Sequence, residues 1–288
     1  MSSRSFMKSL YIYVLLWMTS LVVAPLQAVE VWVTIAPQQY FVERVGGDAV
    51  SVEVLVRPGQ SPELYSPSAA QLARLAKADV YVGMGLPVEH KVLPRIAESM
   101  SQVRVLQTGK LGEADEDHHH HEGCVHGEND PHVWVDPVAM IEFVNQVREL
   151  LVDLKPAEAE HFQANADRVT AELEALDRAL KVQFEPYAGH AFYINHPALG
   201  HFAKRYGIVQ RSLEQAGTDA SARRVAELVK AARTDQVGAV FTQPEFGRSS
   251  AAVVARALKV DVVELNPLAE DYFNNMQHIA DQLVASFQ

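Results

Sequence analysis

The stretch PAEAEHFQANADRVTAELEALDRALKVQF, residues 156–184, decides the fold. It contains no glycine, and its only proline is Pro156, at the very start, where a helix tolerates proline. Most of its other residues favour helix, so we predict one continuous helix here. At 1.5 Å per residue, such a helix is roughly 40 Å long, which is more than one small lobe requires. We therefore expect residues 155–185 to form a stiff connector between two lobes.

Short apolar segments alternate with helical patterns on both sides of this connector. Before it, strands are expected at 29–35, 50–56, 80–84 and 103–106, with helices at 38–45, 66–76 and 88–99. After it, strands are expected at 191–194, 208–212, 238–242 and 260–265, with helices at 199–206, 220–233 and 249–258 and a last helix from Asp271. This alternation is typical of parallel sheets with crossover helices. We predict an α/β fold of two lobes, 29–154 and 186–288, each a mostly parallel sheet flanked by helices.

The first 28 residues have the pattern of a secretory signal peptide. Arg4 and Lys8 precede an apolar run at 10–23, and the small residue Ala28 marks the expected cleavage point. The run is short for a membrane span. A lipoprotein would need a cysteine at the cleavage point, whereas the single cysteine is Cys124. We expect a periplasmic protein without a lipid anchor.

Composition restricts the partners and the kinds of site. Lys and Arg number 25 against 36 Asp and Glu, a net charge of -11, which disfavours nucleic acid as a partner and suits a protein that handles cations. One cysteine excludes an intrachain disulfide and a metal site built from several thiolates.

Histidine is concentrated in one part of the chain. Of the 12 histidines, six lie between 118 and 132, and most of these fall in a polar, acid-rich loop at 113–129. Imidazole nitrogen suits Zn, Cu, Ni or Fe(II). The side chains of adjacent histidines diverge, so the run cannot form one rigid tetrahedral site. We expect an accessory loop that binds metal weakly, with a merely solvated loop as the alternative; its histidines are His118, His119, His120, His121 and His126.

His132 and His196 have a different setting. His132 lies in a rigid segment between Pro131 and Pro137, and His196 directly follows the predicted strand 191–194. Ligands of open α/β sheets bind beyond the carboxyl ends of the strands. Because the two histidines belong to different lobes, we predict a site between the lobes. Glu245, at another strand end, is expected to accept a hydrogen bond from an imidazole.

Several segments resemble the zinc/manganese-type solute-binding proteins of bacterial metal ABC transporters. They are PGQSPELY (58–65), ADV (78–80), GLPVE (85–89), DPHVW (130–134), NHPAL (195–199), FAKRYG (202–207), NPL (266–268) and YFNNM (272–276). They follow the family's order along the whole mature chain, and the histidine-rich loop is similar to that of the zinc-uptake branch. One departure is Glu63, which stands where the family has its first histidine ligand.

The resemblance implies a metal site made by Glu63, His132 and His196, with Asn266 shaping the pocket. It implies an extracytoplasmic, monomeric binding protein, not an enzyme, that captures a divalent metal and delivers it to a membrane permease. Zn²⁺ is the expected metal, with Mn²⁺ or Fe²⁺ as alternatives because carboxylate also suits those ions. Two other interpretations stay open. One is a metal-dependent hydrolase that uses the two-histidine, one-carboxylate site, and the other is a metal-storing or docking module with a degenerate cleft.

Overall fold

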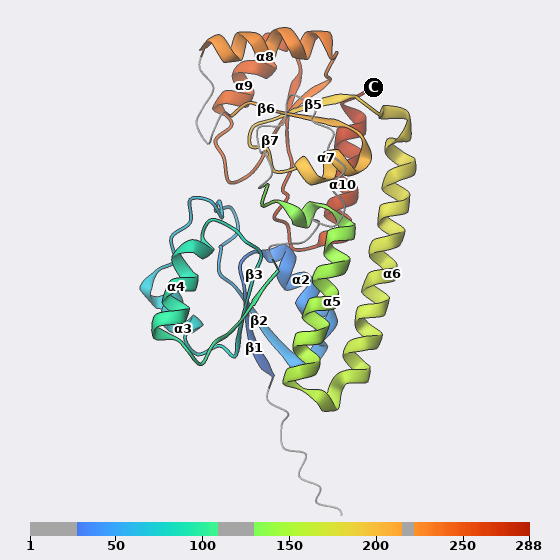
Figure 1. Ribbon diagram of the computed structural model, residues 1–288. Helices are drawn as coiled ribbons and strands as arrows, with labels where there is room; N and C mark the ends of the chain where they lie inside the picture. The colour runs from blue at the N-terminus through green and yellow to red at the C-terminus, as the bar shows by residue number, and fades with distance from the viewer. Residues whose placement is uncertain (1–27, 109–129, 215–221) are drawn as a thin grey trace, which may run out of the picture.

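The computed structural model of the chain describes residues 28–108, 130–214 and 222–288 (Figure 1). The predicted signal peptide, except its last residue, lies outside these ranges. The histidine-rich loop and Cys124 lie outside them as well, so the predictions made for them stay predictions. Within the described ranges, no helix is both long and apolar enough to cross a lipid bilayer.

The first lobe is built on a parallel sheet with the strand order β2-β1-β3-β4. Its strands are β1 (Val29–Val33), β2 (Val50–Val54), β3 (Val80–Gly83) and β4 (Arg104–Gln107). Helices α2 (Ala36–Gly46), α3 (Ala69–Leu75) and α4 (Glu89–Ser99) connect and cover them. The residues of β3 are all buried, which is expected for a central parallel strand that is covered on both faces.

The second lobe repeats this topology with the order β6-β5-β7-β8. Its strands are β5 (Ala191–Ile194), β6 (Val209–Ser212), β7 (Ala239–Thr242) and β8 (Asp261–Glu264). Its helices are α7 (Gly200–Tyr206), α8 (Ala222–Thr234), α9 (Ser249–Leu258) and α10 (Tyr272–Ala285). The predicted fold class is confirmed, although no repeat is visible in the motifs of the sequence.

The predicted connector is present as α6 (Ala159–Phe184), preceded by a 3-10 turn at Pro156–Glu158. Its 26 residues span about 39 Å, and α6 runs beside both lobes in Figure 1. Buried side chains recur every three or four residues, giving one continuous apolar face, at Phe162, Ala166, Val169, Leu173, Leu176, Leu180 and Phe184. The helix contacts α2 in the first lobe and α7 and α10 in the second.

A second long helix, α5 (Pro137–Leu154), was not predicted from the sequence. It pairs with α6 as a helical hairpin. Asp136 begins it, because its carboxylate accepts the Val138 N–H at 2.8 Å, and Pro137 occupies the first helical position. Its buried residues have helical spacing, so the sequence did carry the signal.

One apolar core extends through both lobes, and a second, smaller cluster lies within the second lobe. The rings of Phe41 in α2 and Tyr272 in α10 lie 4.7 Å apart, and the indole N–H of Trp134 donates to the carbonyl of Pro267 at 2.9 Å. Side chains from both halves of the chain therefore pack together, and α6 with α10 links the lobes. This packing favours small relative movements over wide opening.

The contact of α6 with the second lobe should contribute to the free energy of unfolding. Phe184 is fully buried between Phe202 and Tyr206, with ring centroids at 5.4 and 5.7 Å. We expect Phe184→Ala to lower the free energy of unfolding by about 3–5 kcal/mol, measured by urea denaturation. Val182→Ala, in the same helix turn but 71% exposed, should change it by less than about 0.5 kcal/mol. Equal effects would contradict this packing.

Candidate metal centre

Glu63 lies on a tight turn between β2 and α3. Within this turn Ser61 is the anchor, because its hydroxyl accepts the Glu63 N–H at 3.2 Å and its carbonyl accepts the Tyr65 N–H at 2.9 Å. The Val88 N–H, just before α4, donates to the carbonyl of Pro62 at 3.2 Å. On the other side of Glu63, Lys91 Nζ donates to the carbonyl of Tyr65 at 3.0 Å, so the turn is attached to the first lobe on both sides of Glu63. The Glu63 side chain is 25% exposed.

His132 belongs to the segment that leads into α5, at the start of a 3-10 turn (Val133–Val135). Its residue is only 4% exposed, and its ring lies 5.1 Å from that of Trp134. The Asp130 carboxylate holds it twice, since Oδ1 lies 2.7 Å from the ring Nδ1 and accepts the backbone N–H at 3.0 Å.

His196 comes directly after β5, at the carboxyl edge of the second sheet. It is also 4% exposed, and its ring stacks on Phe246 at 4.4 Å between centroids. The buried amide of Gln243, at the end of β7, clamps its backbone: Nε2 donates to the His196 carbonyl at 2.6 Å, and Oε1 accepts its N–H at 3.3 Å. Adjacent strands therefore fix this histidine.

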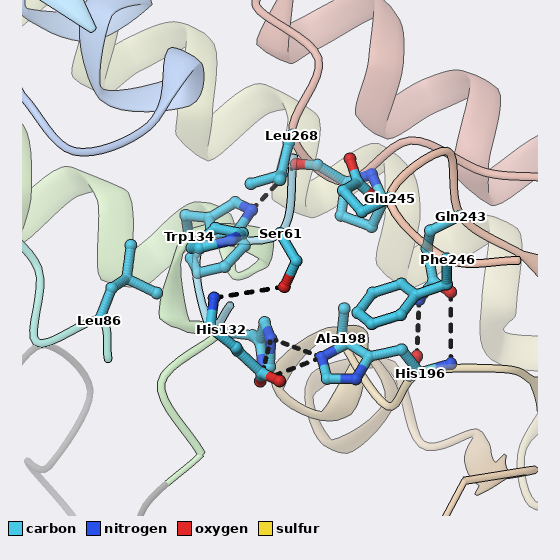
Figure 2. A pocket seen from close by; sticks show the side chains of 13 residues that line it. Ser61, Leu86, His132, Trp134, His196, Ala198, Gln243, Glu245, Phe246 and Leu268 are labelled. Atoms are coloured by element: carbon cyan, nitrogen blue, oxygen red, sulfur yellow. Dashed lines mark hydrogen bonds and ion pairs between the residues drawn. The ribbon is translucent and has the colours of Figure 1, made fainter. Parts of the chain in front are cut away.

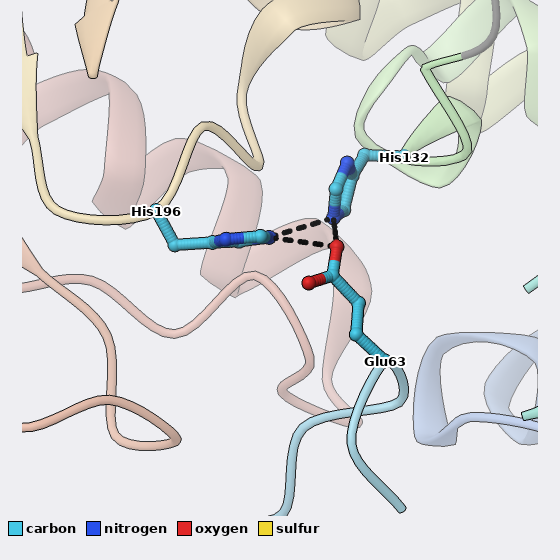
Figure 3. Close-up of side chains that lie close together, drawn as sticks. All are labelled: Glu63, His132 and His196. Carbon is cyan, nitrogen blue, oxygen red and sulfur yellow. Dashed lines mark hydrogen bonds and ion pairs between the residues drawn. The ribbon is translucent and has the colours of Figure 1, made fainter. Parts of the chain in front are cut away.

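The three predicted ligands converge (Figure 3). Glu63 Oε1 lies 3.2 Å from His196 Nε2 and 3.9 Å from His132 Nε2, and the two Nε2 atoms are 3.2 Å apart. A point equidistant from the three atoms lies about 2.0 Å from each of them, which matches Zn–N and Zn–O bonds of about 2.0–2.2 Å. One carboxylate and two imidazoles can therefore reach a single divalent ion.

A carboxylate faces the other nitrogen of each imidazole. Asp130 bonds to Nδ1 of His132, and Glu214 lies 3.1 Å from Nδ1 of His196 while also accepting from Asn195. Such pairs fix ring orientation and turn Nε2 toward a metal. This orienting role, expected of Glu245, belongs to Asp130 and Glu214, so that expectation is wrong.

The same contacts give the two imidazoles different proton affinities. Burial lowers the pKa of His132 below its usual value, despite its hydrogen bond to Asp130. Burial also disfavours protonated His196, but hydrogen bonds to Glu214 and Glu63 outweigh it and raise the pKa of His196 to about 9. At neutral pH His132 is therefore neutral and His196 is protonated, and a metal bound at its Nε2 would have to displace that proton.

A small cavity of about 20 Å³ adjoins these side chains (Figure 2). That volume accommodates about one water molecule. Most of its wall is apolar, and the lining includes Pro62, Leu86, Trp134, Ala198, Phe246, Pro267 and Leu268. The arrangement suits an ion with three protein ligands and one further small ligand.

Two residues expected near the pocket have other contacts. Glu245 lines the cavity, and its buried Oε1 has no hydrogen-bond partner among the described residues; burial raises the pKa of this carboxyl. Asn266 directs Oδ1 to the Leu268 N–H at 3.0 Å, so it shapes the turn that carries Pro267 and Leu268. Asp130 could have been identified from the sequence, because it lies two residues before His132. Glu214 and Gln243 contact His196 only because β6 and β7 lie on either side of β5.

Comparisons with known proteins support the family resemblance seen in the sequence. The model of the family described as zinc-uptake complex component A, periplasmic (ZnuA), matches residues 31–286. The chain is 31% identical over 246 residues to the zinc-binding lipoprotein AdcA of Streptococcus pneumoniae serotype 4 (strain TIGR4), which covers 82% of this chain and 49% of AdcA. The chain thus spans about half the length of that relative.

Solved structures agree. A crystal structure of ZnuA has a TM-score of 0.84 and 29% identity, covering 91% of this chain and all of the other. The Zn(II)-bound ZnuA-like domain of Streptococcus pneumoniae AdcA has a TM-score of 0.73 and 25% identity with the same coverage. The chain therefore belongs to the ZnuA family.

Proposed function

We propose that this protein captures one Zn²⁺ ion between its lobes, outside the cytoplasm, and delivers it to the membrane permease of an ABC transporter. The observation that carries the proposal is the triangle of Glu63 Oε1, His132 Nε2 and His196 Nε2, whose sides fit one ion at zinc bond lengths. Membership of the ZnuA family and the printed names of the AdcA relatives support it.

The donor set supports zinc over harder ions. Two imidazole nitrogens and one carboxylate oxygen are common zinc ligands, and each imidazole already has a carboxylate on its other nitrogen. Mn²⁺ and Fe²⁺ accept the same donors but favour more oxygen ligands or a higher coordination number. We assign Glu63 as the ligand that replaces a histidine.

The surroundings of the site support binding over hydrolysis. The cavity has room for about one water, and its wall is mostly apolar, so it leaves little space for a polar substrate beside the ion. Release is the remaining requirement. Because the lobes share a core, a permease would promote release by stabilising a state with poorer ligand geometry.

Calorimetric titration with Zn²⁺ tests the proposal. To remove accessory binding, the titrations use a full-length background in which the five loop histidines are replaced by asparagine. We expect one high-affinity zinc per chain, weakened by at least about 100-fold in His132→Ala or His196→Ala, because direct ligands matter more than their supporting partners, which are worth about 10–100-fold. His161→Ala, an exposed histidine on α6, is the control and should not change affinity. Zinc binding that disappears with the loop histidines would contradict the proposal.

Zinc binding should also release a proton. With a pKa of about 9, His196 is protonated at about pH 7, so nearly one proton should leave per zinc bound, falling to none well above pH 9. Titrations in buffers of different ionisation enthalpy measure this number. Protonation of His196 opposes zinc binding, but in the metal-free protein it favours the folded state. Protonated His196 stabilises the fold fully below about pH 6.5, and this contribution is lost as the pH rises through about 9. Proton release that does not change with pH would count against this assignment.

Metal preference should depend on Glu63. In Glu63→His, a third imidazole replaces the oxygen donor that Mn²⁺ prefers, so manganese affinity should fall by about 10-fold or more while zinc affinity is retained. Competition titrations with a chromophoric chelator measure both. An equal change for the two metals would show that Glu63 does not determine the metal preference.

A further inference from the structure

Helix α7 of the second lobe packs directly against the segment that holds His132. His201 Nε2 lies 3.0 Å from the carbonyl oxygen of Asp130, a distance at which the ring N–H donates to it. One residue earlier, Gly200 faces the Asp130 carboxylate so closely that a Cβ atom at this position would lie less than 3.0 Å from Oδ2. Both the backbone and the side chain of Asp130 therefore contact α7.

Asp130 lies between this helix and the proposed ligand. Its Oδ2 faces Gly200, while its Oδ1 holds His132 through the ring Nδ1 at 2.7 Å and the backbone N–H at 3.0 Å. The side chain is short and 13% exposed, so it has little freedom to move away. Moving the carboxylate from α7 would strain or break its bonds to His132.

The backbone does not explain why residue 200 is glycine. Gly200 begins the helical part of α7, and it is not among the glycines with positive φ. Alanine would be the better helix former at such a position. Glycine instead leaves space for the Asp130 carboxylate. A Cβ atom at residue 200 would also contact Gln210 Nε2, at 3.6 Å.

We propose that Gly200 is a positioning residue for the metal site: its missing side chain leaves the room that Asp130 needs to orient the His132 imidazole. Through this contact, the second lobe sets the geometry of a ligand that the first half of the chain supplies. The inference rests on the proposed function in one respect, that the oriented imidazole binds zinc.

Gly200→Ala tests the inference. We expect zinc affinity to fall by about 10–100-fold, the usual effect of disturbing a partner of a metal ligand. Straining the buried bonds of Asp130 to His132 should also lower the thermal stability of the metal-free protein. Gly247→Ala is the matched control, because a Cβ there meets its nearest atom only at 4.0 Å. Its affinity should stay within about twofold of the wild type.

A double-mutant cycle with Asp130→Ala separates positioning from a general defect. If the methyl group acts through Asp130, Gly200→Ala should have no further effect once that carboxylate is removed. If Gly200→Ala alone fails to fold because its Cβ collides with Asp130, the double variant, which lacks that carboxylate, should fold. An equal loss of affinity or of folding in the Asp130→Ala background would overturn the inference.

A readout without metal keeps this inference distinct from the proposed function. Long-range ¹⁵N–¹H spectra of the metal-free protein should show His132 with its proton on Nδ1 in the wild type and in Gly247→Ala. Gly200→Ala should give a mixture of the two tautomers. An unchanged tautomer in Gly200→Ala would refute the positioning role. Failure of the wild type to bind zinc would refute the proposed function alone.

Discussion

Three ionisable side chains, Glu63, His132 and His196, meet in a crevice whose wall is mostly apolar, and the other contacts of the site compensate for their burial. Buried imidazoles and carboxylates are costly unless each is hydrogen-bonded or neutralised. Here Asp130 and Glu214 satisfy the outer nitrogens, while the inner nitrogens and Glu63 Oε1 face one another within 3.2–3.9 Å. A proton on His196 reduces the negative charge, and a divalent cation would do so more fully. The cluster is thus poised to exchange a proton for a metal.

The scaffold keeps these groups together although they come from distant parts of the chain. The two sheets have the same strand order, and the proposed ligands lie in loops that follow the strands. A continuous core, the long helix α6 and the contact of α10 with α2 hold the lobes in one relative position. Segment 130–136 depends on the second lobe as well, through α7 on one side and Pro267 on the other.

Much of the fold was predictable because it follows from local patterns. A glycine-free run gave the connector, and alternating apolar segments gave both sheets, with ends shifted by a few residues. Helix α5 was overlooked although its spacing was readable. The proposed ligands came from strand-end positions and from resemblance, which places Glu63 but does not reveal its distance to the imidazoles. Glu214 and Gly200 could not be found this way, because their contacts arise only when strands and helices far apart in sequence are packed together.

The position of the bound metal tests the proposed zinc site most directly. Anomalous diffraction at the zinc edge, from crystals of the protein grown with one equivalent of Zn²⁺, locates the ion without assumptions about its ligands. We predict one strong peak about 2.0–2.2 Å from Glu63 Oε1, His132 Nε2 and His196 Nε2. A fully occupied zinc bound elsewhere, with those three atoms uncoordinated, would contradict it.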